Sequence, residues 1–351
     1  MEGKTVGELN AIRDRMLRKN LIVVAATVVV LILSFILAMY IGPVRFSITE
    51  IFALLAGNGS STDVHIIQNI RLPRILCCVI VGAALSISGL AMQGLFRNPM
   101  ASPSVLGVSS GAAFGASLAM GFGMGAVFGS FAVPALSFIF CFATMVLVYL
   151  LAKTSGGVSV AMLLLAGIAV GAFFNGMVSA VQYMVDEKTL PGIVYWMMGS
   201  FELCTWSSFR LALIPIIAGI ILIWSRAGEL NLISLGEEQA ANLGVNVART
   251  RIILLVGSSL AVAGAVSISG IIGFVGLIIP HIFRMIVGPN HKILVPLSII
   301  GGAAFLMVMD AVSRFVISPN ELPIGILTAL LGAPFFIYIM RTKRKFMLGG
   351  N

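Results

Sequence analysis

The sequence predicts an all-α polytopic membrane protein with ten transmembrane helices and an inverted internal repeat. Three observations support this prediction. The 351-residue chain is 59% hydrophobic and only 10% charged, with a mean hydropathy of +1.08, whereas soluble domains carry roughly 25% charged residues. Long apolar runs follow one another along the chain. In addition, a stretch that begins at residue 74 shares its pattern with one that begins at residue 249.

The apolar runs define the spans, because a helix that crosses a bilayer needs about 20 apolar residues. The predicted spans are residues 21–41, 75–96, 105–118, 128–151, 158–185, 209–224, 252–271, 272–287, 295–316 and 322–340. The third and fourth are rich in glycine and the eighth is short, so their bounds are the least sharply defined. Residues 191–200 are expected to form an additional half-helix. The chain therefore divides into a basic segment 1–20, a membrane domain 21–340 and a basic tail 341–351.

The distribution of lysine and arginine predicts the orientation. With the amino terminus in the cytoplasm, sixteen basic residues fall in inside segments and six in outside segments, as the positive-inside rule requires. We therefore expect a multi-pass protein of the cell (inner, cytoplasmic) membrane with both basic tails in the cytoplasm. The polar stretch 226–251, which separates two apolar spans, then also faces the cytoplasm.

That polar stretch contains a predicted short helix. Ser234 and Glu237 are spaced as a capping box, and Gly244 supplies a glycine stop. A helix with its own start and stop outside the lipid suggests a surface offered to a partner. The alternative is an ordinary solvated loop helix.

The repeat joins two stretches 175 residues apart, RILCCVIVGAALSISG at 74–89 and RTRIILLVGSSLAVAG at 249–264. An odd number of spans separates their starts, so the second copy should enter the membrane from the opposite face. Inverted repeats of this kind are common in transporters, with the pathway at the repeat interface. Chance similarity between spans rich in small residues is the alternative.

Few residues inside the spans can carry chemistry. Asp310 lies within the ninth span, and Arg314 follows one turn later as its i,i+4 partner, which indicates a structural ion pair or a proton relay. The sequence contains no nucleophile or metal-ligand motif and no G-x-x-x-x-G-K-[ST] phosphate loop. We therefore expect a transport subunit and not an enzyme, with no cofactor or metal, and any ATP hydrolysis on a separate chain. The basic residues flank apolar spans without interleaved aromatics, which argues against nucleic-acid binding.

Three arginines stand near the predicted outer face. Arg71 and Arg74 precede the second span, and Arg314 lies toward the outer end of the ninth. Arginines in such places bind carboxylates of a partner bidentately or anchor the chain at the membrane interface.

Several long motifs resemble one family. They are RLPRILCCVIVGAALSISGLAMQGLFRNPMASPSVLGVSSGA (71–112), WMMGSF (196–201), SLGEEQAANLGVNVARTR (234–251), SGIIGFVGLIIPHIFRMIVG (269–288) and DAVSRFVISPNELPIGILTALLGAPFF (310–336). In this order they are similar to the FecCD/BtuC-like permease subunits of ABC importers for iron-siderophore complexes, haem and cobalamin. Met100 and the residues 289–291 depart from the family's usual pattern.

The resemblance implies a BtuC-like fold and a set of partners. These are a second copy in a homodimer, two ATP-binding ABC subunits, an extracytoplasmic substrate-binding protein and the lipid bilayer. Docking of the binding protein is implied for Arg71, Arg74 and Arg314. Within the coupling loop 229–248, the ATPase is expected to contact Ser234, Leu235, Gly236, Glu237, Glu238, Ala240, Leu243 and Gly244.

The expected function is import of an iron chelate, a siderophore or haem. A cobalamin importer is the alternative within the class. An ion-gradient carrier or channel is a second alternative, disfavoured by the sparse intramembrane charge, and a membrane enzyme is a third. The residues of the substrate path remain unassigned.

Overall fold

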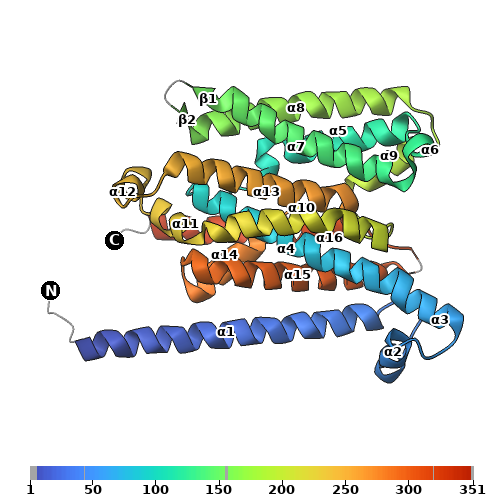
Figure 1. Ribbon diagram of the computed structural model, residues 1–351, viewed down its shortest axis with the longest axis horizontal. Helices are drawn as coiled ribbons and strands as arrows, with labels where there is room; N and C mark the ends of the chain where they lie inside the picture. The colour runs from blue at the N-terminus through green and yellow to red at the C-terminus, as the bar shows by residue number, and fades with distance from the viewer. Residues whose placement is uncertain (1–5, 43, 155–156, 319, 349–351) are drawn as a thin grey trace.

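Long helices, lying side by side, make up most of the molecule (Figure 1). The computed structural model describes residues 6–42, 44–154, 157–318 and 320–348. The long helices are α1 (Val6–Tyr40), α4 (Leu72–Leu95), α5 (Val108–Gly121), α7 (Ala132–Ala152), α8 (Val160–Met184), α10 (Trp206–Ser225), α13 (Val247–Ser269), α14 (Val275–Val287), α15 (His291–Val316) and α16 (Ile324–Leu348).

Short elements connect these helices. They are α2 (Ile48–Leu55), α3 (Ser61–His65), the π-helical η1 (Ile66–Arg71), the 3-10 turns η2 (Pro103–Leu106) and η3 (Gly129–Phe131), α6 (Gly125–Phe128), α9 (Leu190–Met197), α11 (Ala227–Ile233), α12 (Glu237–Asn242), and the strands β1 (Lys153–Thr154) and β2 (Gly157–Val158). The strands pair antiparallel, with Lys153 opposite Val158. The predicted half-helix at 191–200 corresponds to α9.

Each predicted span overlaps one of the long helices. Within the described residues, seven helices are long and apolar enough to cross a membrane, which makes this a multi-pass membrane protein. Two further apolar helices, α14 and the described apolar part of α16, are shorter, and α5 has 14 residues. The length criterion therefore supports seven crossings, and the count of ten remains a prediction.

Helices extend into both predicted basic segments, whose division from the membrane domain stays a prediction. α1 already begins at Val6 and runs without a break into the first span. Its first turns are rich in good helix formers, and α1 contains no proline and no glycine after residue 7. Likewise α16 continues to Leu348 through most of the predicted tail. Residues 1–5 and 349–351, which belong to these two segments, lie outside the described residues.

The centre of the bundle is α4. In the most apolar stretch of the helix that contains α4, 89% of the residues are buried. In the most apolar stretch of α1, only 17% are buried. Two glycines of α4 explain how its neighbours approach so closely. A Cβ at Gly82 would lie 2.2 Å from the carbonyl oxygen of Gly302 in α15, and one at Gly89 would lie 2.0 Å from that of Gly276 in α14. Small residues thus let helix backbones touch where no hydrophobic drive exists between spans, as the glycine content predicts.

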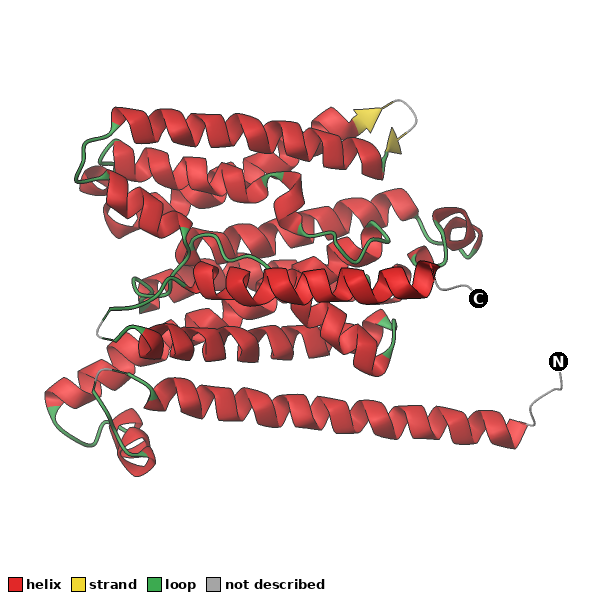
Figure 2. Ribbon diagram, turned by 180° about the vertical axis from the view of Figure 1, so that it is seen from behind, coloured by secondary structure: helices red, strands yellow, loops and turns green. Residues whose placement is uncertain are grey.

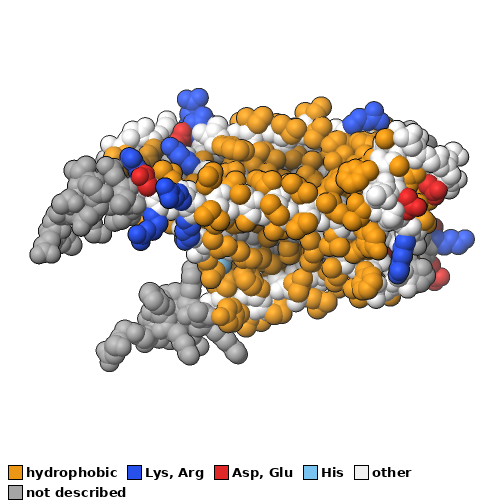
Figure 3. Space-filling view, turned by 90° about the horizontal axis from the view of Figure 1, so that it is seen from below, with side chains coloured by type: hydrophobic (Ala, Val, Ile, Leu, Met, Phe, Trp, Pro, Cys, Tyr) orange, Lys and Arg blue, Asp and Glu red, His pale blue; other side chains and the backbone are white. Residues whose placement is uncertain are grey.

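The surface has an apolar middle and charged ends (Figure 3). We call one end of the bundle the α12 end. It contains α11, α12 and the β1–β2 hairpin, and it is also where α1 begins and α16 ends (Figures 1 and 2). We call the opposite end the α9 end, and it contains α2, α3, α6 and α9. Two candidate sites follow from this arrangement, one at each end.

Candidate functional sites at the two ends of the bundle

The candidate site at the α9 end is centred on Arg74, in the first turn of α4. Its Nε donates to Oδ1 of Asp310 in α15 at 2.9 Å. Its two terminal nitrogens donate to the two carboxylate oxygens of Glu321, at 3.0 and 2.6 Å. This bidentate pair is the strongest geometry available to a guanidinium and a carboxylate. Arg74 therefore ties α4 to α15 and to the loop that precedes α16.

Arg314 completes the charge network around Asp310, whose side chain is wholly buried. Nη2 of Arg314 lies 3.0 Å from Oδ2 of Asp310, which confirms the predicted i,i+4 ion pair. The same guanidinium donates to the carbonyl oxygens of Ala38, at 2.9 Å, and Ile41. These carbonyls end α1, so the network also holds the first helix.

Arg71 stands beside this network without an acidic partner of its own among the described residues. It donates to the carbonyl oxygens of Met39, at 2.7 Å, and Val44. Its guanidinium carbon lies 5.2 Å from the ring centre of Phe46, a cation–π contact.

The three arginines thus lie at one end, as predicted, but they are turned inward. Arg71 is 4% exposed, and Arg74 and Arg314 are each 7% exposed. The sequence analysis missed Glu321, whose side chain remains 21% exposed beside Arg74. Glu321 lies within the motif at 310–336, so its carboxylate could have been considered as a partner for one of the arginines. Docking of a partner on these arginines stays a prediction, and it requires that the arginines release the carboxylates and carbonyl oxygens that they bind in this structure.

The second candidate site is the coupling loop at the α12 end, and here the predicted capping box is wrong. Ser234 closes α11 instead of opening α12, and its hydroxyl donates to the carbonyl oxygen of Leu230 at 2.8 Å. Gly236, at φ 133°, turns the chain, and Glu237 is the first helical residue of α12. Glu237 is therefore not at the third helical position that a capping box requires. Its carboxylate is engaged 2.5 Å from Nη2 of Arg251.

The predicted glycine stop of this helix is confirmed. Gly244 has φ 87°. Its N–H donates to the carbonyl oxygen of Ala241 at 2.9 Å, and the N–H of Val245 donates to that of Ala240 at 3.0 Å. This is the Schellman arrangement, in which a left-handed glycine satisfies the last carbonyls of a helix.

Arg251 connects α12 to the membrane helices. It is 8% exposed, belongs to α13 and also donates to the carbonyl oxygen of Val158, just before α8. In contrast, Leu235 and Leu243 at the two ends of α12 are 62% and 61% exposed. The segment therefore combines a buried connection to α13 and α8 with apolar side chains that point outward.

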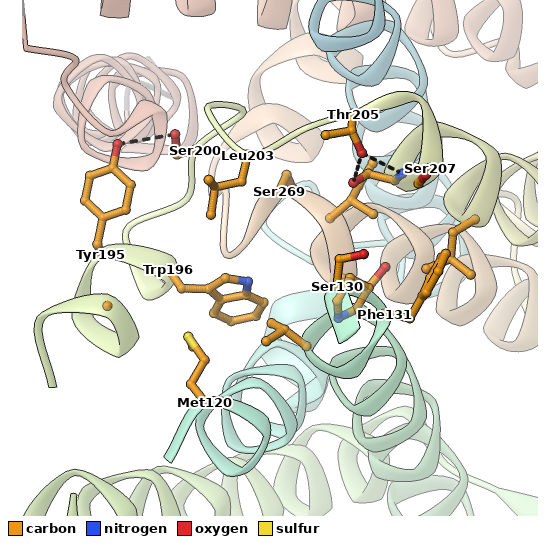
Figure 4. A pocket seen from close by; sticks show the side chains of 17 residues that line it. Met120, Ser130, Phe131, Tyr195, Trp196, Ser200, Leu203, Thr205, Ser207 and Ser269 are labelled. Atoms are coloured by element: carbon orange, nitrogen blue, oxygen red, sulfur yellow. Dashed lines mark hydrogen bonds between the residues drawn. The ribbon is translucent and has the colours of Figure 1, made fainter. Parts of the chain in front are cut away.

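A cavity of about 670 Å³ lies at the α9 end, near the beginning of α10 (Figure 4). Trp196 reaches from α9 toward Ser130 in η3, the turn that precedes α7. Tyr195 donates to the Glu202 carboxylate at 2.6 Å, and partial burial together with this bond raises the pKa of its phenol. The polar residues of the lining are hydroxyl-bearing, namely Ser130, Tyr195, Ser200, Thr205, Ser207, Ser208, Ser267 and Ser269. From this region the sequence analysis had singled out the half-helix 191–200 and the motif 196–201, but not the cavity.

The carboxylates of these sites are not clustered in the way that a metal site requires, within the part of the chain that the structure describes. Among residues 6–42, 44–154, 157–318 and 320–348, no three histidine, cysteine, aspartate or glutamate side chains come together as they would to hold a metal ion. Both sites contain charged and hydrogen-bonding side chains.

Comparison with known proteins gives one consistent result. The sequence model of the FecCD transport family matches residues 30–342. The hemin transport system permease protein HmuU of Yersinia pestis is 40% identical over 292 residues, which is 82% of this chain and 87% of that protein. The molybdate import system permease protein MolB of Haemophilus influenzae is 39% identical over 321 residues, 90% of this chain and 94% of that one. A solved ABC transporter described as metal-chelate type, in an inward-facing conformation, superposes with a TM-score of 0.81 at 38% identity, covering 91% of this chain and 98% of that chain.

Proposed function

The chain belongs to the FecCD transport family, and from this membership we propose that it is the permease subunit of an ATP-driven importer for a metal chelate. The observation that carries the proposal is the family match over residues 30–342 together with the likeness to a metal-chelate type transporter. Hydrolysis of ATP then takes place on a separate ATPase chain. An ion-gradient carrier is the competing function, and it requires no such partner.

We propose the ten-span topology with an inverted repeat and both termini in the cytoplasm. Reciprocal packing supports the repeat. The first copy lies on α4, which packs against α14 and α15, whereas the second lies on α13, which packs against α5 and α7. In a repeat of five spans, α14 and α15 are the counterparts of α5 and α7. The α12 end is then the cytoplasmic end.

The homodimer is proposed from the outward face of α8. Ala172, Asn175, Gly176 and Ser179 are exposed on this face, and a Cβ at Gly176 would meet no atom within 4 Å. An amide that faces lipid is costly, and small residues favour close helix contact. A second copy, or a water-filled path between two copies, would cover this polar face.

The coupling loop 229–248 is proposed as the ATPase contact. Exposed Leu235 and Leu243 supply apolar contact area, and a partner that moves α12 also moves Glu237. Through Arg251, that movement reaches α13 and the residues before α8. This connection provides a physical route from ATP-driven closure to the spans.

Docking of a substrate-binding protein is proposed for Arg71, Arg74 and Arg314, by exchange of partners. Because Glu321 occupies the terminal nitrogens of Arg74, a glutamate from the binding protein must displace it. Replacing Glu321→Gln should therefore strengthen docking, and Arg74→Gln should weaken it, when affinity is measured on the purified permease. Unchanged affinity in both variants would return these residues to a purely structural role.

The cargo is proposed to be an iron chelate, either haem or a siderophore. The likeness to HmuU supports haem, whereas the likeness to MolB shows that similar chains serve chemically different cargoes. The test is uptake by proteoliposomes that contain this chain with the ATPase and binding protein encoded beside it. Hemin, ferric siderophores, cobalamin and molybdate are each offered with and without ATP. ATP-dependent accumulation of hemin or a siderophore is expected, cobalamin or molybdate would correct the cargo, and accumulation driven by an ion gradient alone would overturn the proposal.

A further inference from the structure

A second cavity, of about 250 Å³, lies at the α12 end where α4 ends and α15 begins. It is far larger than the ~30 Å³ that one water molecule occupies in the liquid. Its lining contains cationic and polar side chains but no acidic residue. The lining residues are Gln93, Gly94, Arg97, Pro99, Ser234, His281, Arg284, Pro289 and His291.

Arg284, from α14, is held in place by an amide and not by a carboxylate. One terminal nitrogen donates to Oε1 of Gln93 at 2.8 Å, and Nε2 of Gln93 donates to the carbonyl oxygen of Gly276 at 2.9 Å. No ion pair forms between Arg284 or Arg97 and any carboxylate of the described residues. The fold therefore fixes Arg284 while leaving its charge without a counter-ion.

His291 presents an unused hydrogen-bonding atom to the same place. The residue is 3% exposed, and its Nδ1 lies 2.9 Å from Oδ1 of Asn231, which also accepts from the His291 backbone N–H at 2.7 Å. Because this amide oxygen accepts, Nδ1 carries the proton, and Nε2 of the neutral ring is an acceptor. Nε2 has no partner among the described residues. A Cβ at Gly94 would lie only 2.8 Å from this buried atom, so the glycine leaves room beside it.

Arg97 occupies a backbone position that usually belongs to glycine. At φ 49° it is one of two described non-glycine residues with positive φ. Its N–H donates to the carbonyl oxygen of Gly94 at 3.3 Å, and that of Asn98 donates to Gln93 at 3.2 Å, which makes Arg97 the left-handed residue after α4. An L-residue with a Cβ is strained there. Glycine would end the helix with less backbone strain, so the arginine at this position calls for an explanation that involves its side chain.

We propose that this cavity binds a phosphate group that carries or adjoins a hydroxyl, either free hydrogen phosphate or the glycerol phosphate headgroup of an anionic lipid. The phosphate oxygens accept from Arg97 and Arg284, and the hydroxyl donates to Nε2 of His291. Both requirements of the site are then met by one ligand. A carboxylate from a partner protein meets only the first, because it has no proton to donate and would leave Nε2 unpaired.

The surroundings suit the lipid as one source of the phosphate. Met285 and Ile286, next to Arg284, are 72% and 40% exposed, so apolar surface adjoins the cavity. Basic pockets between membrane helices at the cytoplasmic side are common places for anionic headgroups. Free phosphate needs no such surface, and the two sources can be separated experimentally.

The test uses the purified full chain in a nonionic detergent, with affinities measured by titration. The probes are inorganic phosphate, sulfate, acetate, short-chain phosphatidylglycerol and short-chain phosphatidylcholine. Arg97→Gly removes the guanidinium while relieving the backbone, and Arg249→Ala, at an exposed arginine of α13, is the charge-matched control. His291→Asn keeps a donor for Asn231 but removes Nε2.

Arg97→Gly is expected to weaken binding of phosphate or phosphatidylglycerol about tenfold or more, the scale of a charge-assisted hydrogen bond, without lowering the unfolding temperature. Arg249→Ala should leave the affinity nearly unchanged. Phosphate should bind more tightly than sulfate, which has no hydroxyl at neutral pH, and His291→Asn should abolish that difference. Tighter binding of phosphatidylglycerol than of phosphate identifies the lipid as the source, and the reverse identifies free phosphate.

Three results would overturn the proposal. One is the absence of binding by either phosphate probe at millimolar concentration. Another is binding that Arg97→Gly leaves unchanged. The third is acetate binding as tightly as phosphate, which would assign the cavity to a carboxylate of a partner protein.

Discussion

Replacing Asp310→Asn should destabilise the protein by about 3 kcal/mol. The Asp310 side chain is wholly buried, with Oδ1 2.8 Å from Nη2 of Arg74 and Oδ2 3.0 Å from Nη2 of Arg314. At an effective dielectric constant of about 20, two charges ~3 Å apart attract by about 5 kcal/mol, and desolvation offsets much of this. Breaking a buried ion pair by removing one partner costs about 3–5 kcal/mol. We expect the lower end of this energy range because Glu321 still neutralises Arg74 in the variant. The side-chain oxygen of the asparagine can also still accept a hydrogen bond from Arg74.

The measurement is the free energy of unfolding in detergent micelles, followed with transport in proteoliposomes. Asp186→Asn is the matched control, because Asp186 is exposed, and it should change stability by less than about 0.5 kcal/mol. Adding Arg314→Gln to Asp310→Asn removes the charge left without a partner. The double variant should therefore be more stable than the sum of the two single effects, by about 0.5–3 kcal/mol.

A different pattern would refute this reasoning. If Asp310→Asn unfolds like the parent but no longer transports, the carboxylate acts as a proton relay and not as a structural counter-ion. Additive effects in the double variant would likewise show that the Arg314 pair contributes little.

Three further outcomes follow from the geometry. Arg251→Gln, and more weakly Glu237→Gln, should lower the amount of cargo taken up per ATP hydrolysed in proteoliposomes that contain the ATPase. If uptake per ATP is unchanged in both variants, α12 does not transmit the movement of the ATPase. Ser234→Ala should change unfolding free energy by less than about 0.5 kcal/mol, because the hydroxyl only returns to its own helix, whereas a loss of about 1 kcal/mol would restore the capping role. A cysteine at Asn175 on α8 should form cross-linked dimers on oxidation while one at Ile214, 76% exposed on α10, should not; equal cross-linking would place the dimer contact elsewhere.

Much of the fold is predictable because the relevant forces are simple in a membrane. Apolar runs locate each of the long helices, although α1 and α16 extend well beyond their apolar runs, and glycines such as Gly82 and Gly89 mark the close contacts around α4. The stop at Gly244 is also local, since a left-handed C-cap depends on one residue. These features need no knowledge of distant parts of the chain.

The errors arise where residues far apart in sequence compete. Ser234 and Glu237 have the spacing of a capping box, but Arg251 takes the carboxylate of Glu237, and Gly236 breaks the helix that the box requires. The pairing of Arg74 with Glu321, 247 residues away, was likewise not predicted, while docking on Arg74 stays a prediction. Side-chain pairing across such distances leaves no periodic signal in the sequence.

The buried arginines of the two ends differ in how many segments they hold together. At the α9 end, Arg71, Arg74 and Arg314 are buried and bind carboxylates or carbonyls that belong to four segments, so separating these segments must break charged hydrogen bonds. At the α12 end, Arg97 and Arg284 keep their charge available, and Arg251 is the one arginine there that links α12 to both α13 and the residues before α8. A displacement of α12 is therefore passed through Arg251 to α13 and to the residues before α8, whereas separation of the segments at the α9 end requires the loss of several buried charged hydrogen bonds.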